Sequence, residues 1–176
     1  MSGNSDLQGL GGWLILVGIG VIVSPFRLIL EMGPLFYSLF TNGSFEYLTT
    51  PGTEAYHELW WPLLMFELVF NVLMLTAAVG LIYLFFSKHY LFPKAYIAVA
   101  LISIIFIPLD AWFGSFVITD EPMFDPETTK AFVRVLIGAA IWVPYMLVSE
   151  RVKATFVEHL PGELQQQDTS EASTSA

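Results

Sequence analysis

The chain has 176 residues, of which 55% are hydrophobic and 13% charged, and its mean hydropathy is +0.65. Soluble domains usually contain about 25% charged residues, so the composition indicates an integral membrane protein. The net charge is −9 and no run of Lys or Arg occurs, which excludes a nucleic-acid-binding surface. Because the chain has no cysteine, disulfides and thiolate metal sites are also excluded.

Four apolar stretches are long enough to cross a hydrocarbon layer of roughly 30 Å as helices. Strand-like alternation is absent from them, and only helices or closed barrels satisfy the backbone in lipid. The sequence therefore predicts an all-α, integral membrane four-helix bundle. The bundle is expected in residues 1–160 and a disordered polar tail in 161–176, with spans at about 10–32, 59–86, 95–118 and 131–149. Residues 150–160 are expected to continue the fourth helix to the interface.

Basic residues are unevenly distributed between the connections. One set of connections and flanks holds Lys88, Lys94, Arg151 and Lys153, whereas the other holds only Lys130. Short cytoplasmic segments carry the excess of Lys and Arg, so both termini are predicted to be cytoplasmic.

Ionisable residues inside the spans are the strongest functional signal. Each costs about 2.5–3.5 kcal/mol at the centre of an isolated helix, so such residues must pair, lie near an interface or line water. By their distance along each helix, all fall in the outer half of the bilayer. The five ionisable residues are Arg27, Glu31, Glu67, Asp110 and Arg134, and the amide Asn71 lies one helical turn from Glu67.

We expect these six residues to line a polar pocket that opens to the outer side and binds a ligand or a proton. A static ion-pair cluster that fixes the register of the helices is the alternative, and placement at the interface is a third. Prolines accompany the charges and free backbone carbonyls, which favours a hydrated niche. Helix kinks are predicted at Pro25, Pro62, Pro108 and Pro144.

Catalytic and cofactor motifs are absent from the sequence. The three histidines, at 57, 89 and 159, lie outside the spans, so paired intramembrane haem ligands are excluded. No zinc-protease, nucleophile-elbow or phosphate-loop motif occurs. We therefore expect no catalytic residues, no metal, no cofactor and no enzymatic activity.

Two segments carry a resemblance to a known family. Gly11-Gly12-Trp13, followed by Ser24-Pro25-Phe26-Arg27, and the segment 141–157, which contains Ser149-Glu150-Arg151, are similar to a bacterial domain-of-unknown-function family, the YdgK-like inner-membrane proteins. Glu67 to Asn71 also resembles that family's pattern. The resemblance covers roughly residues 10–157 and implies a four-helix protein of the bacterial inner membrane, with no implied activity.

Two functions fit these observations. The first is a non-enzymatic accessory or assembly component of a membrane complex, because the chain is small and lacks cofactor motifs. The second is a small oligomeric transporter or proton-coupled carrier that uses the charge cluster. The expected partners are the lipid bilayer and either another membrane protein or a second copy of the chain.

Overall fold

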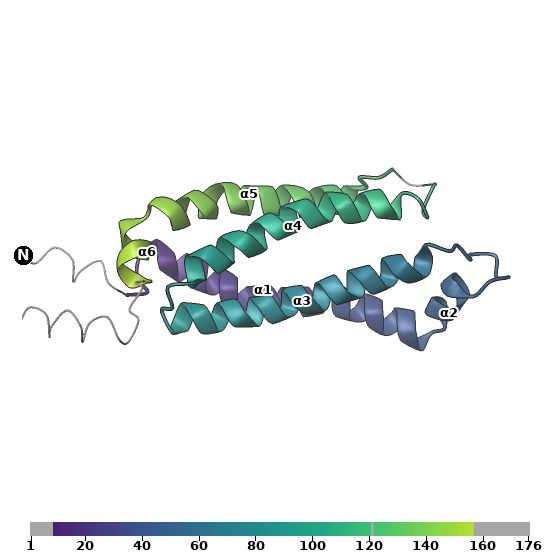
Figure 1. Ribbon diagram of the computed structural model, residues 1–176, viewed down its shortest axis with the longest axis horizontal. Coiled ribbons are helices and arrows are strands. Elements are labelled where there is room, and N and C mark those ends of the chain that lie inside the picture. The colour runs from purple at the N-terminus through teal and green to yellow at the C-terminus, as the bar shows by residue number, and fades with distance from the viewer. Residues whose placement is uncertain (1–8, 121, 157–176) are drawn as a thin grey trace, which may run out of the picture.

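A computed structural model describes residues 9–120 and 122–156. Within these residues the chain is helical and contains no strand (Figure 1). The helices are α1 (Trp13–Thr41), α2 (Ser44–Thr49), α3 (Trp60–Phe86), α4 (Phe92–Gly114), α5 (Pro126–Val148) and α6 (Glu150–Thr155). The predicted tail at 161–176 lies outside the described residues.

Four of the helices are long and apolar enough to cross a membrane: α1, α3, α4 and α5. They contain 29, 27, 23 and 23 residues. At 1.5 Å per residue the shortest is about 34 Å long, which exceeds a hydrocarbon layer of roughly 30 Å. The all-helical architecture expected from the sequence, with four helices that could span a membrane, is present.

The helix bounds differ from the predicted spans at particular residues. The first helix runs on to Thr41, although Pro25 and Pro34 lie within it. The fourth long helix begins at Pro126, because the Asp125 side chain caps it and proline fits the first helical position. Pro62 lies in the first turn of α3, where a missing N–H removes no helical hydrogen bond. Pro108 and Pro144 lie inside α4 and α5.

The long helices pack in chain order. Close backbone contacts join α1 to α3, α3 to α4, and α4 to α5, whereas α1 and α5 do not pack along their length (Figure 1). We call the facing sides of these first and last long helices the α1/α5 seam.

Buried side chains concentrate at the end of the bundle where the described chain begins and ends, which we call the closed end. The cluster there comprises Leu14, Val17, Val21, Leu81, Phe85, Phe92, Met146, Val152 and Phe156. Few side chains are buried at the opposite end, near α2 and the connection between α4 and α5. The bundle is thus tightly packed at one end and loosely packed at the other.

The expected continuation of the fourth helix past Ser149 is wrong. The backbone of Ser149 is extended (ψ 121°), and its hydroxyl accepts a hydrogen bond from the Val152 N–H at 3.4 Å. The chain turns there, and the short α6 covers the closed end. The Phe156 ring stacks on Phe92 with 4.7 Å between the ring centroids. Burial of this apolar face favours the turn over a straight helix.

The two ends of the described chain are joined at the closed end. The Gly9 N–H donates a hydrogen bond to Thr155 Oγ1 at 3.2 Å. The Thr155 hydroxyl in turn donates to the Gly9 carbonyl oxygen, also at 3.2 Å. The Arg151 side chain lies against Gly11 and Gly12, so that a Cβ at Gly11 would be 3.1 Å from Arg151 Nη1. Gly12 also has a positive φ of 59°, which favours glycine.

Candidate intramembrane polar site

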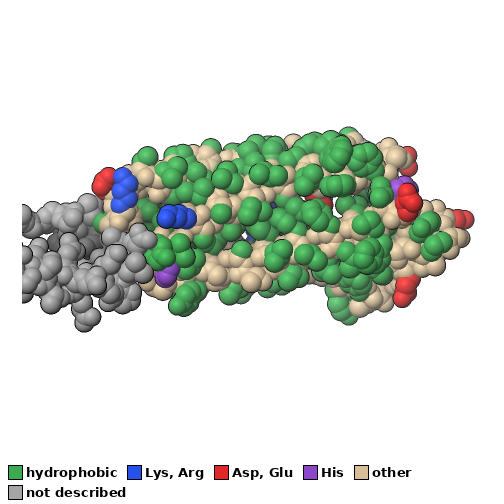
Figure 2. All heavy atoms as spheres, in the orientation of Figure 1, with side chains coloured by type: hydrophobic (Ala, Val, Ile, Leu, Met, Phe, Trp, Pro, Cys, Tyr) green, Lys and Arg blue, Asp and Glu red, His purple; other side chains and the backbone are tan. Residues whose placement is uncertain are grey.

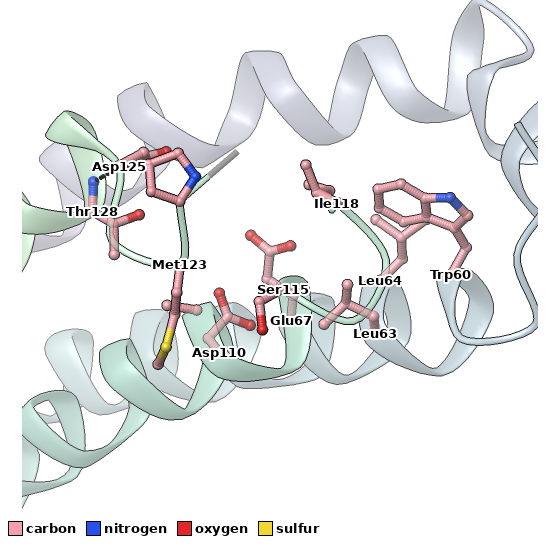
Figure 3. Close-up of a pocket in the computed structure, with 13 residues that line it drawn as sticks. Trp60, Leu63, Leu64, Glu67, Asp110, Ser115, Ile118, Met123, Asp125 and Thr128 are labelled. Carbon is pink, nitrogen blue, oxygen red and sulfur yellow. Dashed lines mark hydrogen bonds between the residues drawn. The ribbon is translucent and has the colours of Figure 1, made fainter. Parts of the chain in front are cut away.

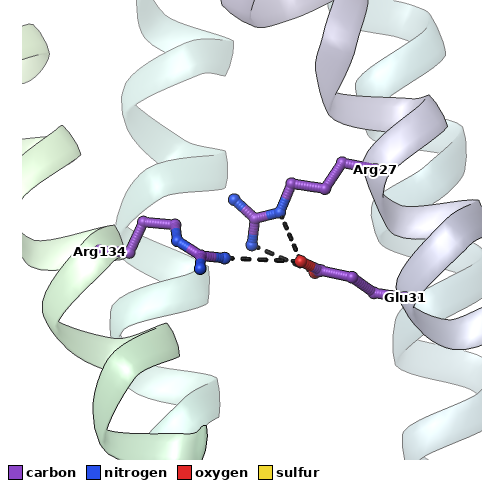
Figure 4. Close-up of polar contacts among 3 residues, drawn as sticks. All are labelled: Arg27, Glu31 and Arg134. Atoms are coloured by element: carbon purple, nitrogen blue, oxygen red, sulfur yellow. Dashed lines mark hydrogen bonds and ion pairs between the residues drawn. The ribbon is translucent and has the colours of Figure 1, made fainter.

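An ion-pair triad links the first and last long helices across the α1/α5 seam. Arg27 Nε is 2.8 Å and Arg27 Nη2 is 3.2 Å from the two carboxylate oxygens of Glu31 (Figure 4). On the other side, Arg134 Nη1 of α5 is 3.5 Å from Glu31 Oε1. We call these three residues the α1/α5 triad.

The local sequence accounts for half of the triad. Residues four apart on a helix lie on one face, so Arg27 and Glu31 form a bidentate pair within α1. Arg134 lies about 12 Å along α5 from its first residue and reaches the same carboxylate. With two guanidinium groups and one carboxylate, the triad carries a net charge of +1.

The triad is only partly covered by the protein. The side chains of Arg27, Glu31 and Arg134 are 44%, 43% and 42% exposed. They lie within helices that are long and apolar enough to span a membrane. Charged groups at this depth require protein or water around them.

A second group of polar residues lines a cavity at the loosely packed end (Figure 3). The cavity has a volume of about 200 Å³ and lies between α3, α4 and the start of α5. Glu67 enters from α3 and Asp110 from α4, and Ser115 and Thr128 contribute hydroxyl groups to its wall. We call this space the acidic cavity.

One oxygen of the acidic cavity has no protein partner among the described residues. Asp110 Oδ1 is buried and accepts no hydrogen bond from them. A buried carboxylate oxygen without a donor is unfavourable, whereas a polar cavity of this volume has room for several waters at about 30 Å³ each. The chemistry that fits the cavity is therefore that of water, a proton or a small cation.

The connection at the mouth of the acidic cavity is held by a helix cap. Asp125 Oδ1 accepts a hydrogen bond from the Thr128 N–H at 2.6 Å. This hydrogen bond holds the pKa of the Asp125 carboxyl below its ordinary value. Asp125 and Thr128 also line the cavity, so the cap fixes the start of α5 at its wall.

Asn71 lies in neither polar group. Its side-chain amide donates to the Glu67 backbone carbonyl at 2.9 Å. The residue lines a different, mostly apolar groove of about 160 Å³ between α1 and α3, beside Leu28 and Met32. An amide that bonds to its own helix can remain in such a groove without a partner from a second helix.

The six residues expected to line one pocket thus occupy three places. Arg27, Glu31 and Arg134 form the triad, Glu67 and Asp110 line the acidic cavity, and Asn71 lies in the apolar groove. Within the described residues, neither Arg27 with Asp110 nor Glu67 with Arg134 forms an ion pair. Distance along each helix places residues at a depth but does not give the direction in which they point.

Several contributors to these sites carried a weaker signal in the sequence. Asp125-Pro126 is a typical helix start. This signal predicts a fourth helix that begins at Pro126 and therefore includes Thr128, which lines the cavity. The contact of Arg151 with Gly11 and Gly12 joins residues far apart in the chain and has no local signature. Among the described residues, no group of three His, Cys, Asp or Glu side chains is placed to hold a metal ion.

The distribution of charge along the outside of the bundle agrees with a membrane location. In Figure 2, hydrophobic side chains cover the middle of the visible face, basic side chains gather toward the closed end, and acidic side chains are numerous at the opposite end. Large apolar side chains such as Trp13, Leu30 and Ile105 are more than half exposed. An apolar belt of this kind fits contact with a lipid bilayer.

A family model matches most of the chain. Residues 7–157 match the family described as "Protein of unknown function (DUF2569)". The chain belongs to this family. The match includes all four long helices of this DUF2569 member, the triad, the acidic cavity and α6. No curated protein and no solved structure matches the chain.

Proposed function

We propose that this DUF2569 member is a multi-pass protein of the bacterial inner membrane whose closed end faces the cytoplasm. Lys88 lies in the connection between α3 and α4, Lys94 lies in the first turn of α4, and Arg151 and Lys153 lie in α6, all toward the closed end. Of the Lys and Arg residues in the connections and at the helix ends, Lys130 alone lies toward the opposite end, and Arg134 lies deeper in the same helix. This asymmetry is the one that sets orientation in membrane proteins.

Single cysteines in the cysteine-free chain test this orientation. In intact cells a membrane-impermeant maleimide should label Glu54→Cys, in the connection between α2 and α3. It should label Ser87→Cys, in the connection between α3 and α4, only after permeabilisation. The reverse pattern would contradict the proposed orientation.

We further propose that the protein is a non-enzymatic accessory or assembly component of a membrane complex. The observation that carries the proposal is the exposure of the α1/α5 triad at membrane depth. Charged residues facing lipid at this depth would cost several kcal/mol together, even after partial pairing. A neighbouring membrane protein over the seam would remove that cost.

The test is purification of the tagged protein from its own membranes at native expression in a mild detergent, with quantitative mass spectrometry. The proposal expects a second membrane protein in a fixed stoichiometry with the tagged chain. Matched membranes that lack the tag control for proteins retained by the resin. Recovery of this chain alone, across several mild detergents, would contradict an accessory role.

The acidic cavity favours a second candidate function, a small oligomeric carrier that couples to protons. Glu67 and Asp110 line one cavity from neighbouring helices, and Asp110 Oδ1 has no partner among the described residues. Carboxyl groups in such a setting can gain and lose a proton during transport.

Proteoliposomes that contain a pH-sensitive dye test the carrier. The carrier function expects proton flux that Glu67→Gln and Asp110→Asn abolish, while Glu46→Gln, in α2, leaves the flux unchanged. Flux that matches protein-free liposomes, or that survives both substitutions, would contradict it.

A further inference from the structure

The charge of the α1/α5 triad is not balanced by the ion pairs among the described residues. Glu31 accepts from two guanidinium groups, and its contact with Arg134 is the longer one, at 3.5 Å against 2.8 Å for Arg27. No other acidic side chain among the described residues forms an ion pair with Arg134. A second carboxylate at the seam would therefore meet an uncompensated positive charge.

Two glycines on the helix faces that carry the triad leave room beside this charge. Gly20 lies seven residues before Arg27, and Gly138 lies four residues after Arg134, so each glycine shares the helix face of its arginine. A Cβ built at Gly20 or at Gly138 would meet nothing within 4 Å. Because α1 and α5 are antiparallel, both glycines lie on the same side of the triad, toward the closed end.

Glycines facing open space allow another helix to approach the backbone closely, as in many membrane helix pairs. Here such a helix would pass directly beside the arginines. Ile141, seven residues after Arg134, lies on the same face of α5 and is 55% exposed. The seam thus combines an uncovered positive charge with small and exposed apolar residues on the same helix faces.

We propose that the α1/α5 seam binds a transmembrane helix of a partner protein, and that this helix carries one carboxylate at the depth of Arg134. The inference rests on the proposed role as a component of a membrane complex and names the chemistry of its partner. The partner carboxylate forms an ion pair with the guanidinium of Arg134, while Arg27 keeps its bidentate pair with Glu31. The pairing neutralises the seam.

Charge complementarity favours such a partner over a second copy of the chain. In a twofold dimer formed through this face, two triads of charge +1 would approach each other, which is unfavourable in a medium of low dielectric constant. An acidic partner helix removes the charge instead.

The test uses the full chain in lipid vesicles and a designed helix as probe. The probe is a Leu/Ala helix of about 20 residues. It carries one Glu at its eighth position, and otherwise identical probes carry Gln or Leu there. Association is measured by energy transfer between a dye on the protein at Ser87→Cys and a dye on the probe.

The proposal expects the Glu probe to bind at least about tenfold more tightly than the Gln probe, as for a close charge pair at an interface. Arg134→Gln should remove this preference, whereas Lys130→Gln, one turn away on α5, should keep it. Glu31→Gln should strengthen binding of the Glu probe, because it raises the charge of the seam. Arg134→Glu should transfer the preference to a probe that carries Lys.

Cross-linking locates the bound probe. A cysteine at Ile141, in the seam, should form a disulfide with a probe cysteine, whereas a cysteine at Val79 on α3 should not. The two native side chains are equally exposed, at 55% each, so the comparison controls for access from lipid. Equal cross-linking at both positions would overturn the proposal, and so would equal affinity for the Glu and Gln probes.

Failure of this inference is distinguishable from failure of the proposed function. If a native partner stays bound to the Arg134→Gln variant and cross-links at positions other than Ile141, the accessory role stands and binding at the seam is contradicted. Absence of any native partner would contradict the accessory role itself. Cross-linking of two copies of the chain through Ile141 would show that a second copy occupies the seam and would overturn the proposal of an acidic partner helix.

Discussion

The ring of Phe85 lies directly against Gly18, so that a Cβ at Gly18 would be 2.8 Å from Phe85 Cε1. This contact holds α1 close to α3 at the closed end. The ring also meets Phe92 and Phe156, with ring centroids 5.1 Å and 5.9 Å away, and therefore cannot move aside freely. The packing of the closed end thus depends on the absence of a side chain at residue 18.

Gly18→Ala should destabilise the protein by about 1–3 kcal/mol, because the added methyl group overpacks a filled core. Gly20→Ala is the matched control on the same helix, since a Cβ there meets nothing within 4 Å. Alanine raises helix stability, so the control should be neutral or slightly stabilising. Thermal unfolding in one detergent checks both variants, and equal effects would contradict the described contact.

Thr155→Val should loosen the junction between the two ends of the described chain. The substitution keeps the shape of the side chain but leaves the Gly9 N–H and carbonyl without their hydroxyl partner. We expect a loss of about 1–2 kcal/mol in unfolding free energy and faster hydrogen exchange in α6. Thr155→Ser retains the hydroxyl and should stay close to the native protein in both measurements.

Acidification should loosen the start of α5. The Thr128 N–H holds the pKa of Asp125 below its ordinary value of about 3.9, so the cap is fully formed above that pH. The stabilisation is lost as the pH falls through the lowered pKa of the folded protein. Exchange of the Thr128 amide, measured by hydrogen–deuterium exchange and corrected for its intrinsic pH dependence, should speed up over that range.

A variant of the same residue checks the assignment. Asp125→Asn keeps a capping oxygen and removes the titration, so its corrected exchange should not change with pH in that range. If the corrected exchange of the Thr128 amide does not change with pH in the native protein, or still changes in Asp125→Asn, the proposed role of the cap is contradicted.

Water should reach the acidic cavity from the end of the bundle opposite to the closed end. Ser115 lines the cavity, whereas Ser103 lies further along α4 and donates to the Val99 carbonyl at 3.0 Å. A small, charged, membrane-impermeant thiol reagent added from outside should modify Ser115→Cys much faster than Ser103→Cys. Similar rates at both positions would show that the cavity is closed to water.

The four long helices could be predicted from the sequence because lipid requires about 20 apolar residues for each span. The end of the fourth helix could not, since the turn at Ser149 depends on the burial of Phe156 against Phe92. The same limit applies to the polar site. Spacing within α1 predicts the pair of Arg27 with Glu31, but only the packing of the helices separates Glu67 and Asp110 from it.

The mass of the particle in which the chain resides tests the accessory role most directly. Native mass spectrometry of the tagged protein, extracted from its own membranes in polymer-bounded lipid discs, gives that mass without dissociation by detergent. The accessory role predicts a particle in which one or more chains of 19.7 kDa accompany a second polypeptide. Particles whose polypeptide mass is only a whole multiple of 19.7 kDa would contradict it.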